Sequence, residues 1–218
     1  MMQKLYRSEY PGEFVIIDTV FSNGEKKQTR EWVNNPIEVK STSRRACCIA
    51  PGEDTETFPM IRLEKHPGGL LGRDRMQLYA TETLWKKLNS DFLIVQDQYN
   101  LNEILEAGYQ NDHIVYTSTK LCIENPGEFY LIPYGIRLLS PATALWLACF
   151  DGHKEIFMFG YNYYDEDEKI VSQIKKVMDT YNDVNFYHVT DNISPELFRR
   201  CINCEIIGKR DFVTRCDI

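Results

Sequence analysis

Residues 136–165, IRLLSPATALWLACFDGHKEIFMFGYNYYD, decide the fold of the chain. Ser140 supplies a capping hydroxyl and Pro141 suits the first helical position, so the sequence predicts a helix over 141–150. The apolar run that follows Gly152 predicts a strand over 154–160. A helix that passes through a short turn into an apolar strand is typical of a sheet covered by helices.

The same alternation of apolar runs and helical segments extends in both directions, from residue 44 onward. Several of the runs are continuously apolar, which is typical of strands that helices cover on both faces. We therefore predict a Rossmann-like α/β fold with a mostly parallel sheet flanked by helices. Strands are predicted at 46–50, 76–80, 92–96, 114–117, 129–132, 154–160 and 185–189, and helices at 83–88, 101–107, 141–150, 166–181 and 195–202.

Residues 1–43 differ from the remainder and predict an N-terminal β-hairpin extension, with residues 44–218 forming the Rossmann-like domain. Residues 14–21 are rich in β-forming side chains, and a turn signal separates them from residues 26–33, which can return antiparallel. An isolated two-stranded ribbon is marginal in water. We therefore expect the hairpin to bind a second copy of the chain or a partner protein through its apolar residues Phe14, Ile16, Val20 and Trp32.

The composition limits the classes of function. With 218 residues, 43% of them hydrophobic, the chain can bury one sizeable core rather than two. Its net charge of −7 disfavours broad binding to nucleic acid or to an anionic membrane. The N-terminal segment has no apolar run of signal-peptide length, and no later segment approaches the roughly 20 apolar residues that cross a bilayer. The sequence therefore predicts a cytoplasmic protein.

Seven cysteines, an odd number without framework spacing, are expected to be mostly reduced. Cys201 and Cys204 form a CxxC pair, and Cys216 follows. Three thiolates could hold a metal ion if a further ligand came from elsewhere. Because no local residue completes such a set, small buried thiols are the favoured interpretation, and no metal site is predicted.

Ligands of an open parallel sheet bind beyond the carboxyl ends of its strands. Loops of this kind are expected at 50–54, 81–83, 139–141 and 160–164. The first of them has a single glycine, so the chain lacks a GxGxxG dinucleotide fingerprint, and it also lacks a GxxxxGK[ST] phosphate loop. Classical NAD, FAD and P-loop nucleotide sites are therefore disfavoured.

The 136–165 stretch resembles small bacterial sialyltransferases and the related domain of flagellin-modifying glycosyltransferases and archaeal pterin pyrophosphokinases. That family carries a Thr-Ser-Gly turn, a helix, Gly-Tyr-Lys-Glu-Ile, an apolar strand and Gly-Ile-Asp-Phe-Tyr at the same spacing. Ser140 falls on the family serine, and GYNYY at 160–164 falls on the end of the strand. Weaker similarity at 44–54 and 185–192 extends the resemblance over residues 44–192.

The resemblance implies a site for a nucleotide-sugar, favouring a CMP-sugar, with no metal or further cofactor. Tyr164 would then bind the departing phosphate. The chain departs from the family at several of these places. Pro51 and Thr81 stand where the family has nucleotide-binding asparagines, Pro141 replaces a glycine, and Asn162 replaces an aspartate.

The family's long lid, which carries a histidine proposed as general base, has no counterpart after Tyr164. Another carboxylate would have to activate the acceptor, and Asp97, which follows a predicted strand, is a candidate. The stretch HPGGLLGRDR at 66–75 combines glycines with Arg73 and Arg75. It predicts either an anion site or, as the favoured interpretation, a mobile surface loop. The acidic run at 165–168 is attributed to a helix dipole rather than to a metal.

Two functions therefore remain open, together with a weaker third. The chain is either a glycosyltransferase or a catalytically inactive binding or assembly protein that keeps the fold, and a transferase acting on a nucleic-acid base is the weaker alternative. The predicted cleft is lined by Pro51, Gly52, Asp54, Thr81, Asp97, Ser140 and Tyr164. If Gly52 lies against a ligand, Gly52→Val is expected to block binding while leaving the fold intact.

Overall fold

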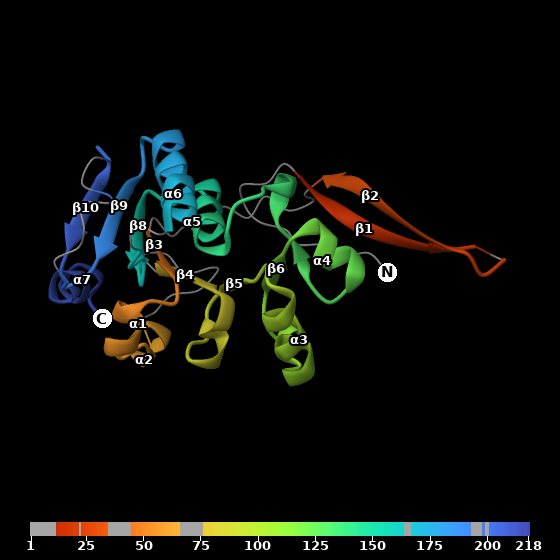
Figure 1. The fold of residues 1–218 in the computed structure, drawn as a ribbon, viewed down its shortest axis with the longest axis horizontal. Helices are drawn as coiled ribbons and strands as arrows, with labels where there is room; N and C mark the ends of the chain where they lie inside the picture. The colour runs from red at the N-terminus through yellow and green to blue at the C-terminus, as the bar shows by residue number, and fades with distance from the viewer. Residues whose placement is uncertain are drawn as a thin grey trace. The chain divides into compact units, whose positions relative to one another are not determined.

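The computed structural model describes residues 12–21, 23–34, 45–65, 76–163, 167–192, 198 and 201–218. They belong to two compact units (Figure 1). The first unit comprises Met1–Lys40 and Val95–Arg137, and the second comprises Ser41–Ile94 and Leu138–Ile218. The hairpin thus shares a unit with a segment from the middle of the chain.

The second unit contains a parallel sheet, which confirms the predicted Rossmann-like α/β class. All of the pairings between its neighbouring strands are parallel. The first strand, β3, lies between β8 and β4, so the chain winds outward from β3 in both directions and the topological switch point lies between β3 and β8. The strands run in the order β10 (Cys204–Ile207), β9 (Asn185–Val189), β8 (Glu155–Phe159), β3 (Arg45–Ile49), β4 (Met76–Thr81) and β5 (Phe92–Ile94).

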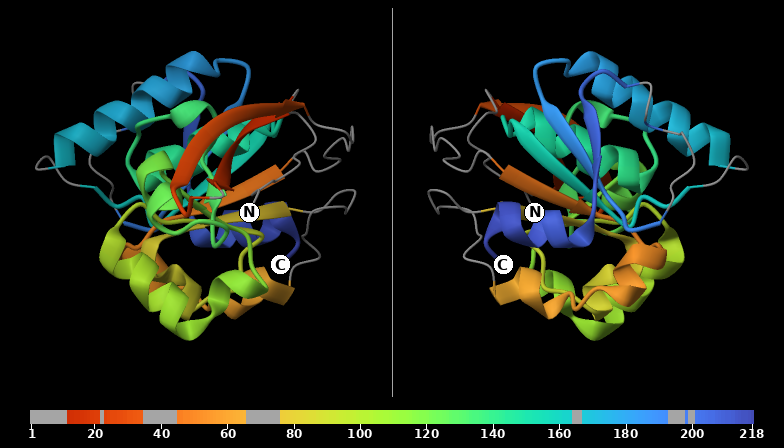
Figure 2. Two further views of the ribbon diagram at one scale, coloured as in Figure 1. Left: turned by 90° about the vertical axis from the view of Figure 1, so that its right-hand side faces the viewer. Right: turned by 90° about the vertical axis from the view of Figure 1, so that its left-hand side faces the viewer.

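Helices cover both faces of this sheet (Figure 2). One face carries α5 (Ser140–Phe150) and α6 (Glu168–Thr180), and the other carries α1 (Glu53–Thr57) and α7 (Lys209–Cys216). On the α7 face the Phe212 ring lies 5.1 Å from the ring centroid of Phe157, and Phe58 lies 4.8 Å from Phe159. The unit also contains α2 (Ile61–Lys65) and the 3-10 helix η1 (Glu82–Lys86).

A buried polar cluster ties β4 to the turn between α5 and β8. The Tyr79 hydroxyl donates a hydrogen bond to the Asp151 carboxylate and lies 3.0 Å from His153 Nε2, and that nitrogen lies 2.7 Å from Gln77 Oε1. All four side chains are buried. Since an unpaired polar group would be costly there, these bonds fix the turn against the sheet.

The first unit contains the predicted hairpin, in which β1 (Gly12–Val20) pairs antiparallel with β2 (Lys26–Asn34). β1 lies outside the parallel sheet and contacts η3 (Pro133–Gly135). Gly24, with φ of 83°, forms the turn. The other elements of this unit are α3 (Gln98–Ala107), η2 (Tyr109–Asn111), β6 (Val115–Thr117), α4 (Thr119–Glu124) and β7 (Tyr130–Leu131).

Several short helices were not predicted from the sequence, namely α1, α2, α4 and α7. Each is too short to show a clear period, and packing against the rest of its unit provides most of the stability of such short helices. The predicted helix at 195–202 lies largely outside the described residues. Among the described residues, no helix has both the length and the apolar character needed to cross a bilayer.

Two glycines bring the carboxyl ends of β3 and β8 together. A Cβ atom on Gly52 would lie 2.2 Å from the carbonyl oxygen of Gly160, and one on Gly160 would lie 2.1 Å from the carbonyl oxygen of Ala50. Gly160 also has a φ of 77°, which favours glycine. Only glycine at both positions lets the two backbones pack this closely.

We expect Gly52→Ala to lower the free energy of unfolding by about 1–3 kcal/mol, because the methyl group meets backbone that must move. Gly160→Ala should lower the free energy of unfolding further, since a side chain in the left-handed backbone conformation of Gly160 adds a penalty of about 1–2 kcal/mol. Gly24→Ala is the control: its φ is also positive, but no described atom lies within 4 Å of the added Cβ. Chemical denaturation measures all three, and equal losses at Gly24 and Gly160 would contradict the packing argument.

Candidate functional site

The candidate site lies at the carboxyl edge of the second unit's sheet, around the switch point between β3 and β8. Gly52 is the N-cap of α1, and its carbonyl accepts a hydrogen bond of 2.6 Å from the Thr55 hydroxyl. Gly160 and Asn162 follow β8 on the facing loop. The predicted loops at 50–54 and 160–164 therefore do lie side by side, as their described residues show.

Asn162 binds the start of α1 through both ends of its side-chain amide. Its Nδ2 donates to Asp54 Oδ2 at 2.6 Å, and its Oδ1 accepts from the backbone N–H of Asp54 at 3.2 Å. That N–H is one of the groups that a helix start leaves without an intrahelical partner. Asn162 thus fills the place at which a helix N-terminus would otherwise meet an anion.

Lys209, from the start of α7, neutralises the Asp54 carboxylate. Its Nζ lies 2.7 Å from Asp54 Oδ1 and donates to Thr57 Oγ1 at 2.7 Å. Burial acts to raise the pKa of Asp54, but hydrogen bonds from Lys209, Asn162 and Thr190 outweigh it, so the pKa falls below its usual range. Because the Asp54 side chain is completely buried, this ion pair joins α7 to α1 in the interior of the unit.

Ser140 and Glu82 form the second polar part of the site. The Ser140 hydroxyl, at the first residue of α5, donates to the carboxylate of Glu82, which directly follows β4. Glu82 has a φ of 52°. A non-glycine residue in this region is strained, and such strain is concentrated at functional sites.

The sequence predicted Thr81, rather than Glu82, as the binding residue at the end of β4. Thr81 is buried, and its hydroxyl donates to the carbonyl oxygen of Ile49 at 3.2 Å, so it joins β4 to β3. Glu82, next in sequence, is the side chain that reaches Ser140. The signal for it was a carboxylate at the end of the second strand of a doubly wound sheet, which is where such folds bind ribose.

The remaining predicted residues are distributed as follows. Pro51 is exposed on the β3 loop. Asp97 belongs to the first unit, where it is the N-cap of α3 and accepts a bond of 3.0 Å from the N–H of Asn100. Tyr164, Arg73 and Arg75 lie outside the described residues.

The aromatic residues after β8 act in packing. Tyr161 is buried, and its hydroxyl donates to the carbonyl oxygen of Pro141 at 3.0 Å, which ties the β8 loop to the start of α5. Burial raises the pKa of Tyr161 far above its usual value. The Tyr163 ring meets that of Tyr161 edge to face, with centroids 6.0 Å apart. Tyr161 is therefore not available to stack on a ligand.

The expectation that Gly52→Val leaves the fold intact is wrong. The space beside Gly52 is filled by the backbone of Gly160 and, 3.0 Å away, by Asn162 Oδ1. A valine side chain would push β3 and β8 apart before it reached any ligand. Loss of binding in that variant would therefore report damage to the fold.

The buried side chain of His188 lies near the Asp54 carboxylate. His188, on β9, packs edge to face against Phe198 at 5.2 Å between centroids. Burial lowers the pKa of His188 to about 4, although the Asp54 carboxylate and the Tyr161 backbone act to raise it. His188 is therefore neutral in the folded chain at neutral pH.

This shift makes folding sensitive to acid. The folded-state pKa of about 4 lies below the usual 6.5, so the unfolded chain binds the proton first as the pH falls between these values. The free energy of unfolding should then drop by about 1.4 kcal/mol per pH unit, or roughly 3 kcal/mol in total. Denaturation at a series of pH values measures how steeply the free energy of unfolding falls with falling pH. That slope should be shallower in His188→Leu, whereas the control His113→Gln should keep the slope of the unmodified chain. An unchanged slope in His188→Leu would contradict the assignment.

Within the described ranges, no group of three or more His, Cys, Asp or Glu side chains is arranged to hold a metal ion. The polar groups of this edge instead form two sets: the Asp54, Asn162 and Lys209 cluster, and the Glu82 and Ser140 pair. Comparison of the chain with known protein families, with curated proteins and with solved structures gives no match.

Proposed function

We propose that the chain is a glycosyltransferase that binds a nucleotide-activated sugar at the carboxyl edge of the second unit's sheet and transfers the sugar to an acceptor. The resemblance of residues 136–165 favours a CMP-sugar. The switch point between β3 and β8 supports this location, since doubly wound sheets bind nucleotides there.

The observation that carries the proposal is the placement of Glu82. A carboxylate at the end of the second strand is suited to accept hydrogen bonds from sugar hydroxyls. The left-handed backbone of Glu82 costs stability, and the bond to Ser140 fixes its carboxylate at the start of α5. A strained, oriented carboxylate at this edge favours ligand recognition over a purely structural role.

The roles of the other residues follow from this arrangement. Ser140 orients the carboxylate, and Glu82 replaces Asp97 as the candidate to accept a proton from the acceptor, because the Asp97 carboxylate already caps α3. Tyr164 is proposed to contact the departing phosphate, and Arg73 with Arg75 to contribute positive charge. The roles of these three residues are inferred from the sequence.

Glu82→Gln tests the site directly. Losing a charged hydrogen bond of about 1.5–3 kcal/mol should weaken binding roughly ten- to a hundredfold, while the amide keeps the shape of the side chain. Calorimetric titration with CMP and with CMP-, UDP- and GDP-sugars measures the change. Glu106→Gln, an exposed carboxylate on α3, is the matched control. Unchanged affinity in Glu82→Gln would remove this carboxylate from the site.

A second candidate is a protein that keeps the fold and binds or assembles without catalysis. It is favoured by the mutual pairing of Asp54, Asn162 and Lys209, which leaves the β3 loop stabilised by the protein itself. Nucleotide release from the three sugar nucleotides, with and without cell extract as a source of acceptor, separates the candidates. Release that depends on extract supports the transferase, whereas binding without release supports the second candidate.

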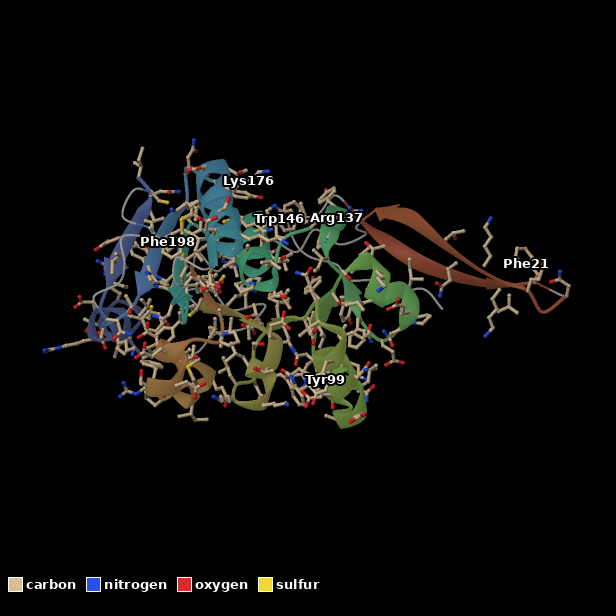
Figure 3. All side chains as sticks on the ribbon, viewed as in Figure 1. Phe21, Tyr99, Arg137, Trp146, Lys176 and Phe198 are labelled. Carbon is tan, nitrogen blue, oxygen red and sulfur yellow. The ribbon has the colours of Figure 1, made fainter. Side chains whose placement is uncertain are left out.

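For this second candidate we propose that the hairpin joins two copies of the chain. Val20 is 65% exposed and Phe21 is 46% exposed at the turn end of the hairpin, where Figure 3 shows Phe21. The turn itself is fixed by backbone bonds, from Phe21 N–H to the Glu25 carbonyl at 2.8 Å and from Gly24 N–H to the Phe21 carbonyl at 2.9 Å. Both side chains can therefore be changed without breaking these bonds.

The double variant Val20→Ser and Phe21→Ser should shift the chain from dimer to monomer in light scattering, because the apolar contact is lost. Lys27→Ser, an exposed change near the same turn, should leave the dimer in place. A monomer in the unmodified chain, or a dimer that survives the double change, would contradict assembly through this end of the hairpin.

A further inference from the structure

The CxxC pair lies in a tight turn that leads into β10. The backbone N–H of Cys204 donates to the carbonyl oxygen of Cys201 at 3.2 Å, which closes a four-residue turn. A turn of this kind brings its first and fourth Cα atoms within about 7 Å. A disulfide spans Cα atoms that are about 4.4–6.8 Å apart, so the two cysteines are in range of one another.

The turn is held in place by the side chain of Asn203. Its Nδ2 lies 3.1 Å from each of three carbonyl oxygens, those of Met178, Tyr181 and Val184, at and after the end of α6. The backbone carbonyl of Asn203 accepts a hydrogen bond of 2.8 Å from the backbone N–H of Phe186. The turn is therefore fixed in the reduced chain, and closing a disulfide across it would order little further backbone.

These two cysteines are also the accessible ones. All seven cysteines lie among the described residues, and five of them, Cys47, Cys48, Cys122, Cys149 and Cys216, are buried, whereas Cys201 and Cys204 are both partly exposed. Burial raises the pKa of Cys204 to about 12, and that of Cys201 is also raised by burial. Both are therefore mainly thiols rather than thiolates at neutral pH.

We propose that Cys201 and Cys204 are a redox modification site that forms a reversible disulfide across this turn when a peroxide is the oxidant. The Cys201 thiolate attacks one oxygen of hydrogen peroxide, the O–O bond breaks, and hydroxide leaves, which gives a sulfenic acid. Cys204 loses its proton and its sulfur attacks that of Cys201, so that the S–S bond forms as the S–O bond breaks. In sum, two thiols and one peroxide become one disulfide and two waters.

The test is peroxide treatment of the full chain, followed by thiol titration, intact mass and peptide mapping under non-reducing conditions. We expect the loss of two thiols, a mass decrease of two hydrogen atoms, and a peptide linking Cys201 to Cys204. A dithiol reductant should reverse all three. The rate should rise with pH, because the attacking thiol must first lose its proton.

Single variants separate the two steps. Cys204→Ser should stop at the sulfenic acid on Cys201, which dimedone traps, and Cys201→Ser should form no disulfide. Alkylation of the unmodified folded chain is a second measurement, in which Cys201 and Cys204 should react before the five buried thiols. A disulfide elsewhere, a dimer linked through Cys201, a sulfinic acid beside an intact Cys204 thiol, or no reaction would each overturn the proposal.

Discussion

The close approach of Gly52 and Gly160 is the constraint on which the rest of this edge depends. With hydrogen atoms at both positions, the loops after β3 and β8 pack backbone to backbone at the switch point. That contact brings Asn162 to the start of α1, where it binds both the N–H and the carboxylate of Asp54. Lys209 then completes the cluster from α7, so the last helix of the chain is secured by the geometry of two strand ends.

This arrangement leaves two polar sets at the carboxyl edge, one around Asp54 and one around Glu82. Around Asp54, donors and acceptors are matched within the protein, and the buried charge is balanced. Around Glu82, the carboxylate accepts a hydrogen bond from Ser140, and the backbone is strained. The second set is the one that we propose for sugar recognition, because backbone strain is concentrated at functional sites.

Buried polar groups recur through the second unit and have different consequences. The Gln77, Tyr79, Asp151 and His153 cluster stabilises the turn before β8 by mutual hydrogen bonding. His188 is neutral because burial lowers its pKa, which makes the fold sensitive to acid. Asn203 holds three carbonyls at and beyond the end of α6, and so fixes the only partly exposed cysteines of the chain in one turn. Pairing of polar groups thus stabilises the core and fixes the dithiol turn, whereas burial alone makes His188 pH-dependent.

The sequence by itself determined the α/β class, the hairpin, and the helix and strand of residues 141–160, because apolar runs and turn residues are local signals. The capping role expected of Ser140 is wrong, since Leu139 is the N-cap of α5 and the Ser140 hydroxyl donates to Glu82 instead. It also identified the loops after β3, β4 and β8, since strand ends in a parallel sheet share an edge. Only the tertiary structure decided which side chains those loops use. Gly52 serves packing against Gly160, Thr81 bonds Ile49, and Asp97 caps its own helix, whereas Glu82 reaches Ser140 across 58 residues of chain. Such pairings depend on distances between segments remote in sequence, which no local pattern encodes.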